Sequence, residues 1–252
     1  MNLEDYEKLD PRCIVKQGGV EVVYATPTTA ARWRVDTLFE KEPVTIDWIA
    51  RIRPGEVLAD VGANVGMYTI WAARTAGAQV YAFEPESLNY ALLNRNILYN
   101  KVADRVHAYC LALSDHQGLG ELHLSRFVAG GSCHQLDEKV DPFLRPAEPV
   151  FTQGCVAATL DGVVESGKVP LPQHIKIDVD GFEPNVVRGA AAALRSGGVR
   201  SLLIEVNPAL PEHLAMVRQL NAMGFRHDPE QVRRATRAGG PFAGCAEYVF
   251  AR

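Results

Sequence analysis

Short apolar runs that alternate with helical segments constrain the fold of this chain more than any other feature. The runs are 57-VLADVG-62, 79-QVYAFEP-85, 105-RVHAYCLALS-114, 174-HIKIDV-179, 201-SLLIEV-206 and 245-CAEYVFA-251, and the helical segments between them are 65–77, 87–100, 184–195 and 211–224. Strands that alternate with helices of this length form βαβ units and a mainly parallel sheet. The pattern therefore predicts an α/β fold, to which the last helix and strand could add antiparallel edges.

The 252 residues suit one domain with additions to its core. Residues 1–53 form an N-terminal extension that ends in a lead-in helix over 36–53, where Pro43 marks a helix start. Residues 54–115 and 173–252 carry the regular pattern and form a cofactor-binding half and a substrate-side half. Between them, residues 116–172 contain five prolines and seven glycines, which is typical of an inserted lid or pocket segment.

Charge and cysteine content exclude several classes of protein. The chain has 26 basic and 30 acidic residues, a net charge of −4, so no positive field attracts nucleic acid. No apolar stretch reaches the length of a membrane span, and the charged N-terminus does not resemble a signal peptide. The five cysteines are scattered and form no CxxC pair. We expect a cytoplasmic protein with a small-molecule partner, and a homo-oligomer is compatible with the sequence.

The first strand ends in a glycine turn, Asp60-Val61-Gly62-Ala63-Asn64-Val65-Gly66. A dinucleotide loop, GxGxxG, would need glycine where this chain has Asn64 and Met67, and no P-loop follows. The second strand ends in Glu84, and an acid there can accept both hydroxyls of a ribose. Asp60, at the turn, suits a ligand with positive charge beside that ribose. S-adenosylmethionine combines ribose hydroxyls with an ammonium and a sulfonium.

At this point the chain resembles the FkbM family of S-adenosylmethionine-dependent methyltransferases. The similar segments are 60-DVGANVGMYT-69, 83-FEP-85, 112-ALSD-115, 159-TLD-161, 175-IKIDVDGFE-183 and 188-RGA-190, with 41-KEPVTIDWI-49 before them. Where the family often has Glu, this chain has Asp180. The resemblance implies a class I methyltransferase fold, which is Rossmann-like, with a mainly parallel seven-stranded sheet and helices on both faces.

The resemblance also implies the cofactor site. Asp60, Gly62, Asn64 and Gly66 would hold the amino-acid part of the cofactor, and Glu84 would hold its ribose. Ser114 and Asp115 would lie at the adenine. Neighbouring residues in the same segments complete the expected set, namely Ala63, Tyr68, Thr69, Pro85, Leu113 and Asp178.

The fourth strand carries the candidate catalytic groups. Lys176, Asp178 and Asp180 share one face of it, although both faces of a central strand are normally apolar. Asp178 is the first candidate for a general base or for a carboxylate beside the sulfonium, and Asp180 and Glu205 would complete a substrate or metal cluster. No metal ligands are predicted, and Mg²⁺ is a less favoured alternative.

Structural roles compete with these. Lys176 and Asp178 could form an ion pair, and Asp180 and Glu183 could stabilise a helix dipole. The basic run that ends in Arg237 suits a solvated loop.

These residues favour transfer of a methyl group from S-adenosylmethionine to a hydroxyl of a small molecule. The family resemblance implies a sugar, a glycolipid or a polyketide-type metabolite as the acceptor. The inserted segment 116–172 would form the acceptor pocket or a lid. Alternatives are N- or C-methylation of a small metabolite, a nucleotide-binding oxidoreductase and a non-catalytic binding module.

Overall fold

A central sheet of seven strands organises the molecule, which a computed structural model describes over all 252 residues. The strands are β3 (Val57–Val61), β4 (Gln79–Phe83), β5 (Val106–Tyr109), β10 (His174–Ile177), β11 (Ser201–Val206), β12 (Arg226–His227) and β13 (Ala246–Ala251). Their order is β12-β13-β11-β10-β3-β4-β5, with β13 antiparallel to both β11 and β12 and every other adjacent pair parallel. The predicted mainly parallel sheet is confirmed.

Helices cover both faces of this sheet, as predicted. They are α3 (Pro43–Ile49), α4 (Met67–Trp71), α5 (Ser87–Asn100), α6 (Leu160–Glu165), α7 (Glu183–Gly189), α8 (Ala191–Arg195), α9 (Pro211–Ala222) and α10 (Pro229–Ala235). Successive residues of β3 point to opposite faces, so Leu58 packs in a core with α3, α4 and α5. Ala59 and Val61 pack in a second core with α7 and α9. β3 therefore contributes apolar side chains to a core on each face of the sheet.

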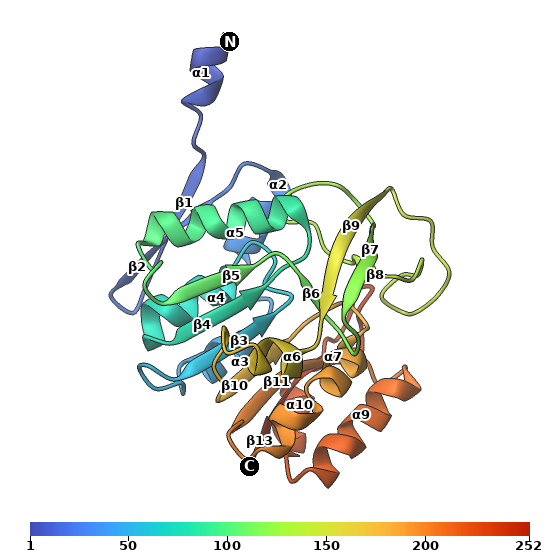
Figure 1. Cartoon of the computed structure of the whole chain (residues 1–252). Coiled ribbons are helices and arrows are strands. Elements are labelled where there is room, and N and C mark those ends of the chain that lie inside the picture. The colour runs from blue at the N-terminus through green and yellow to red at the C-terminus, as the bar shows by residue number, and fades with distance from the viewer.

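The N-terminal extension differs from its prediction. It contains α1 (Leu3–Glu7), which projects from the body (Figure 1), the hairpin β1 (Arg12–Gln17) and β2 (Val20–Ala25), and a helix α2 (Thr29–Asp36). The expected helix over 36–53 is wrong in its first half. The side chain of Thr28 accepts the N–H of Ala31 at 3.0 Å and starts α2 earlier, whereas α3 begins at Pro43 as expected.

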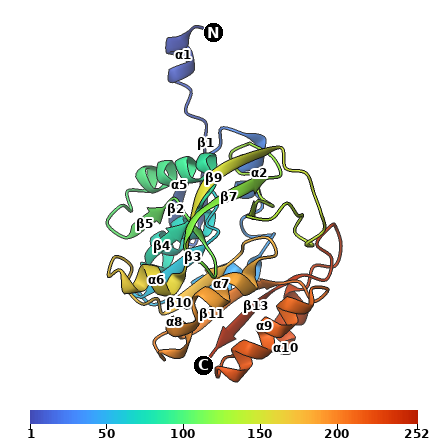
Figure 2. The same ribbon diagram turned by 45° about the vertical axis from the view of Figure 1, so that its right-hand side comes forward.

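The inserted segment forms most of a second sheet of four strands beside the first (Figures 1 and 2). Its strands are β6 (Ala112–Leu113), β7 (Gly118–Leu124), β8 (Gln135–Leu136) and β9 (Phe151–Ala158), in the order β6-β9-β7-β8. The predicted single strand 105–114 is therefore wrong. The chain leaves the central sheet after Tyr109, and β6 pairs with β9 instead, followed by a bond from the N–H of Ser114 to the carbonyl of Ala158 at 2.8 Å.

Two predicted helices are also shorter or broken. The segment 65–77 forms α4 and then one π-helical stretch, η1 (Ala72–Ala76), which ends at the left-handed Gly77. The segment 184–195 breaks at Ala190 into α7 and α8. No helix of the structure combines the length and the apolar character needed to cross a bilayer.

Candidate active site

Three cavities meet at the carboxyl ends of β3 and β10, where Gly62 and Asp178 follow the strands. An inner cavity of about 290 Å³ lies against β4, β6 and β8. An outer cavity of about 350 Å³ lies under α2 and the loop at Phe242, and a small cavity of about 40 Å³ lies between α2 and the glycine loop. Gly62, Asn64 and Asp178 line all three. In a parallel sheet this edge is where ligands bind.

The glycine loop takes its shape from close backbone contacts. Gly62 has φ +75°, and a Cβ added there would lie 1.9 Å from the carbonyl oxygen of Asp178. Asn64 is also left-handed, with φ 52°, a conformation that asparagine tolerates better than most residues. Its side-chain amide donates to the carbonyl of Gly131 at 2.6 Å, so the inserted segment is bound directly to the loop.

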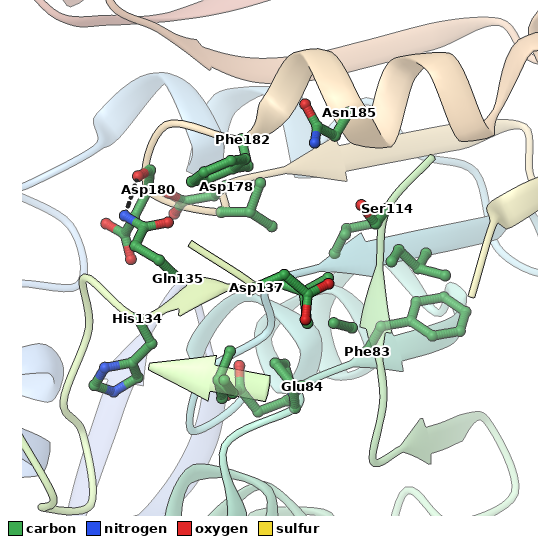
Figure 3. A pocket seen from close by; sticks show the side chains of 18 of the residues that line it. Phe83, Glu84, Ser114, His134, Gln135, Asp137, Asp178, Asp180, Phe182 and Asn185 are labelled. Atoms are coloured by element: carbon green, nitrogen blue, oxygen red, sulfur yellow. Dashed lines mark hydrogen bonds between the residues drawn. The ribbon is translucent and has the colours of Figure 1, made fainter. Parts of the chain in front are cut away.

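Glu84 connects the end of β4 to this loop. Its Oε2 accepts the N–H of Asn64 at 2.7 Å and its Oε1 accepts the N–H of Glu86 at 3.0 Å. Burial raises the pKa of Glu84 to about 7, against these hydrogen bonds, which lower it. Figure 3 shows Glu84 and Ser114 entering the inner cavity from different strands. Each carboxylate oxygen still has a lone pair free for a hydroxyl.

The far wall of the inner cavity is formed around Ser114 and Asp115. Asp115 accepts a hydrogen bond from Nε of Arg188 at 3.0 Å, which fixes the chain after β6 against α7. A Cβ on Gly189 would lie 1.9 Å from the carbonyl oxygen of Ser114, so α7 approaches this wall as only glycine allows. Pro85 and Leu113 line the same cavity.

Beneath the loop, three of the expected cofactor residues are buried. Asp60 accepts a hydrogen bond from the hydroxyl of Thr69 at 2.5 Å, while its other oxygen has no hydrogen-bond partner. Gly66, with φ +83°, precedes α4. None of the three lines any of the three cavities, whereas Ala63 and Tyr68 line the small one. Asp60, Gly66 and Thr69 therefore support the loop from beneath, and the expectation that they contact the cofactor stays a prediction.

Lys176 forms an ion pair with Asp178, which is the structural role that competed with a catalytic role in the sequence analysis. The Lys176 side chain is 2% exposed, and its ammonium lies 3.2 Å from Oδ2 of Asp178 and 3.7 Å from Oδ1 of Asp60. Burial acts to raise the pKa of Asp178, but Lys176, Lys41 and Arg237 together hold it well below its usual range. Asp178 is therefore ionised at neutral pH.

Asp180 has the opposite electrostatic setting. Burial, and then the charge of Asp178, raise its pKa above that of an ordinary carboxyl group. Its Oδ2 accepts the N–H of Cys133 at 2.7 Å, and its carbonyl accepts the amide of Gln135 at 2.7 Å (Figure 3). The proposed helix-dipole role is not observed, because Asp180 binds the inserted segment. Glu183 accepts the N–H groups of Val179 and Gly181 and stabilises that turn.

Glu205 lines the outer cavity but does not join the two aspartates in a metal cluster. Its carboxylate is bound by Arg237, whose guanidinium also lies 2.7 Å from Glu247 and 3.6 Å from Glu42. The expectation of a solvated loop at Arg237 is therefore wrong, since three carboxylates surround it. No three acidic, histidine or cysteine side chains converge as metal ligands would.

Sequence reasoning missed the polar side chains that fix the inserted segment over the site. Asn89, on α5, accepts the N–H of Gly130 at 2.7 Å and donates to the carbonyl of Gly131 at 3.1 Å. Arg34, on α2, donates from Nε to the carbonyl of Gly130 at 2.8 Å. The glycine-rich composition of 116–172 was the one sequence signal near these contacts, because polar residues on helices carry no pattern of their own.

The model of the FkbM methyltransferase domain matches residues 60–227, which contain the glycine loop, Glu84, Asp178 and Asp180. The chain belongs to the FkbM methyltransferase family. It is therefore an S-adenosylmethionine-dependent methyltransferase with a class I fold, and the oxidoreductase alternative is wrong.

Relatives of this FkbM methyltransferase include the hexuronic acid methyltransferase AglP of Haloferax volcanii. That protein is 26% identical over 197 residues, which cover 77% of this chain and 74% of the relative. The 31-O-demethyl-FK506 methyltransferase FkbM of Streptomyces tacrolimicus is 42% identical over 69 residues, 27% of this chain and 26% of the relative. Among solved structures, a putative rRNA methylase from Clostridium thermocellum is 9% identical, with a TM-score of 0.49 over 83% of this chain and 93% of that one.

Proposed function

We propose that this FkbM methyltransferase moves the methyl group of S-adenosylmethionine to a hydroxyl of a small molecule. One observation carries the proposal. Asp178 and Asp180 line both the inner and the outer cavity, so the two carboxylates stand where a cofactor on one side would meet an acceptor on the other. Such alignment supplies much of the acceleration of an in-line displacement.

The inner cavity fits the cofactor by its chemistry. Glu84 offers acceptor oxygens for the ribose hydroxyls, and Ser114 with Asp115 forms a polar wall for the adenine. Gly62 and Asn64 line the same cavity and would offer backbone groups to the amino-acid part of the cofactor. The bound cofactor supplies an electrophilic methyl group on a positively charged sulfur. The ionised Asp178 stabilises that positive charge.

Asp180 is the better general base of the two aspartates. A base must bind a proton in the transition state, and a carboxylate with a raised pKa does so more readily. Asp178, whose pKa is lowered by its cations, is a weak base and a stable negative charge. In this proposal Glu205 shapes the acceptor side through Arg237 rather than binding Mg²⁺.

The names of two relatives support a small-molecule acceptor. One is named for hexuronic acid and another for the 31-O position of demethyl-FK506, so we propose a sugar, a glycolipid or a polyketide-type metabolite as the classes to test. A slightly acidic chain suits such acceptors better than nucleic acid. All five cysteines are free, which is in keeping with action in the cytoplasm.

The test is to incubate the enzyme with isotope-labelled S-adenosylmethionine and a lysate metabolite pool, and to identify labelled products by mass spectrometry. We expect the label on an oxygen, with no transfer by an Asp180→Asn variant that still binds S-adenosylhomocysteine. Label on nitrogen or carbon would replace O-methylation by the corresponding alternative. No label with any pool, despite cofactor binding, would favour a non-catalytic module.

A further inference from the structure

We infer that the acceptor carries a negatively charged group, a carboxylate or a phosphate, which binds Arg126 and Arg34 in the outer cavity. This inference rests on the proposed function and names the chemistry of its acceptor. Both guanidinium groups line the outer cavity beside Asp178 and Asp180, so an anion bound there would lie next to the reacting centre.

The carboxylates of the outer cavity already have partners inside the protein. Asp178 is bound by Lys176 at 3.2 Å, and Glu205 is bound by Arg237. Asp180 accepts the backbone N–H of Cys133 at 2.7 Å. None of the three therefore needs an external cation, and none reaches Arg34 or Arg126 in a salt bridge.

The cations of the cavity divide into two groups. Arg237 is shared among Glu205, Glu247 and Glu42, and Lys41 lies 2.5 Å from Glu42. Arg34 and Arg126 form no salt bridge, and the hydrogen bonds of Arg34 go to the neutral carbonyls of Gly130 and Gly131. Arg34 is thus held by its Nε, and no carboxylate forms a salt bridge with it. A guanidinium with free N–H groups is suited to bidentate binding of a carboxylate or phosphate.

A half-buried histidine of the inner cavity lies near both arginines. Burial, then the charges of Arg126 and Arg34, lower the pKa of His134 to about 4. His134 is consequently neutral at pH 7 and cannot add a competing charge. Trp33 and Phe242 form apolar walls of the outer cavity, on which a ring-shaped acceptor can pack.

The cofactor itself does not neutralise both arginines that lack a salt bridge. S-adenosylmethionine brings an ammonium, a sulfonium and one carboxylate, so its binding adds net positive charge to the site. Arg34 also lines the small cavity above Gly62 and Ala63, where the cofactor carboxylate could engage it. Arg126 lines only the outer cavity of the three. At least one unpaired guanidinium therefore faces the acceptor in the loaded enzyme.

The first experiment fractionates the candidate acceptors by their charge before the reaction. A lysate metabolite pool is divided by anion exchange at pH 7 into retained and unretained fractions, and each is incubated with enzyme and labelled S-adenosylmethionine. We expect the labelled product from the retained fraction. Phosphatase treatment of that fraction beforehand would abolish labelling if the anion is a phosphate and leave it unchanged if the anion is a carboxylate. Labelling confined to the unretained fraction would overturn the inference and leave the methyltransferase proposal intact, whereas no labelling of either fraction would count against both.

The second experiment uses variants with the retained fraction or its purified acceptor. Arg126→Gln should lower kcat/KM about 10- to 100-fold, mainly through KM, which is the usual effect of losing a charged hydrogen bond. Its affinity for S-adenosylhomocysteine should stay within twofold of the unmodified enzyme. The matched control is Arg218→Gln, because Arg218 is an exposed arginine on α9 that lines none of the three cavities. Equal KM values for Arg126→Gln and Arg218→Gln would contradict the role of Arg126.

Discussion

Lys176 reaches Asp178 from inside the sheet, with its side chain 2% exposed and its ammonium 3.2 Å from the carboxylate. Asp60 lies 3.7 Å from the same ammonium, so one buried cation forms ion pairs with two carboxylates. This arrangement keeps Asp178 charged at the point where the cavities meet, and it makes Lys176 responsible for both the stability of the strand end and the electrostatics of the site.

Lys176→Met should therefore remove the nearest cation from Asp60 and Asp178. We expect the free energy of unfolding to fall by about 3–5 kcal/mol, the usual effect of breaking a buried ion pair. Urea denaturation measures the change. Lys168→Met, at an exposed position without an ion pair, should lie within about 0.5 kcal/mol of the unmodified protein. A loss below about 1 kcal/mol for Lys176→Met would mean that water or another cation replaces the ammonium.

Gly62→Ala tests the close approach between the loop and the end of β10. The new Cβ would lie 1.9 Å from the carbonyl oxygen of Asp178, so the loop or β10 must shift, and binding of S-adenosylhomocysteine should be lost. Gly167→Ala is the control, because Gly167 has φ +71° but nothing within 4 Å. It should lose only about 1–2 kcal/mol from its left-handed backbone and keep its binding. Equal losses of stability and of binding in the two variants would show that the left-handed backbone alone, without the close contact to Asp178, accounts for the glycine at position 62.

The affinity for S-adenosylhomocysteine should fall as the pH falls through about 7, because that is the pKa of Glu84 and the ribose hydroxyls need the ionised carboxylate. The carboxyl is mostly ionised at pH 8 and mostly protonated at pH 6, so Kd from calorimetry should rise about tenfold between them. Glu84→Gln should bind more weakly at both pH values and lose the dependence. Glu165→Gln, at an exposed position, should retain it. A flat profile in the unmodified enzyme would remove Glu84 from ribose recognition.

Asp180→Asn and Asp178→Asn should differ in their pH profiles. If Asp180 is the base, its replacement lowers kcat by about 10²–10⁴-fold and removes the acid limb of the kcat profile. That limb should lie above the pH expected for an ordinary aspartate, because the pKa of Asp180 is raised. Asp178→Asn should lower kcat but keep an acid limb. Steady-state rates between pH 5 and pH 9 measure these profiles. An unchanged acid limb in Asp180→Asn would show that another group is the general base.

The central sheet could be predicted from the sequence because its strands are apolar on both faces and its turns carry glycine and acids. Glu84 and Asp178 were found for the same reason: polar residues at the ends of apolar strands stand out. The strands β12 and β6 have two residues each and are too short to show a hydrophobic period. The apolar residues of β6 predicted a strand of the central sheet, whereas β6 pairs with β9 in the second sheet.

The rest of the site could not be predicted because it depends on contacts between distant segments. Arg34 lies in α2, a helix whose start depends on the side chain of Thr28. Arg237 lies in a basic run of the kind that is usually exposed to solvent, yet it binds Glu205. Their burial and partners arise from packing of α2 and the α10–β13 connection. No local pattern distinguishes an arginine that three carboxylates bind from one in water.

The contacts of the loop at Gly130 and Gly131 have a consequence for how the protein assembles. Thr28 donates to Ala129, Arg34 to Gly130 and Asn64 to Gly131, across 101, 96 and 67 residues of chain. These bonds join polar side chains to backbone carbonyls and lie outside the strand pairing of the seven-stranded sheet. The hydrogen bonds of the sheet therefore do not depend on this loop, whereas the walls of the binding cavities do. A destabilised chain should release this loop first, and lose its ligands while its core remains folded.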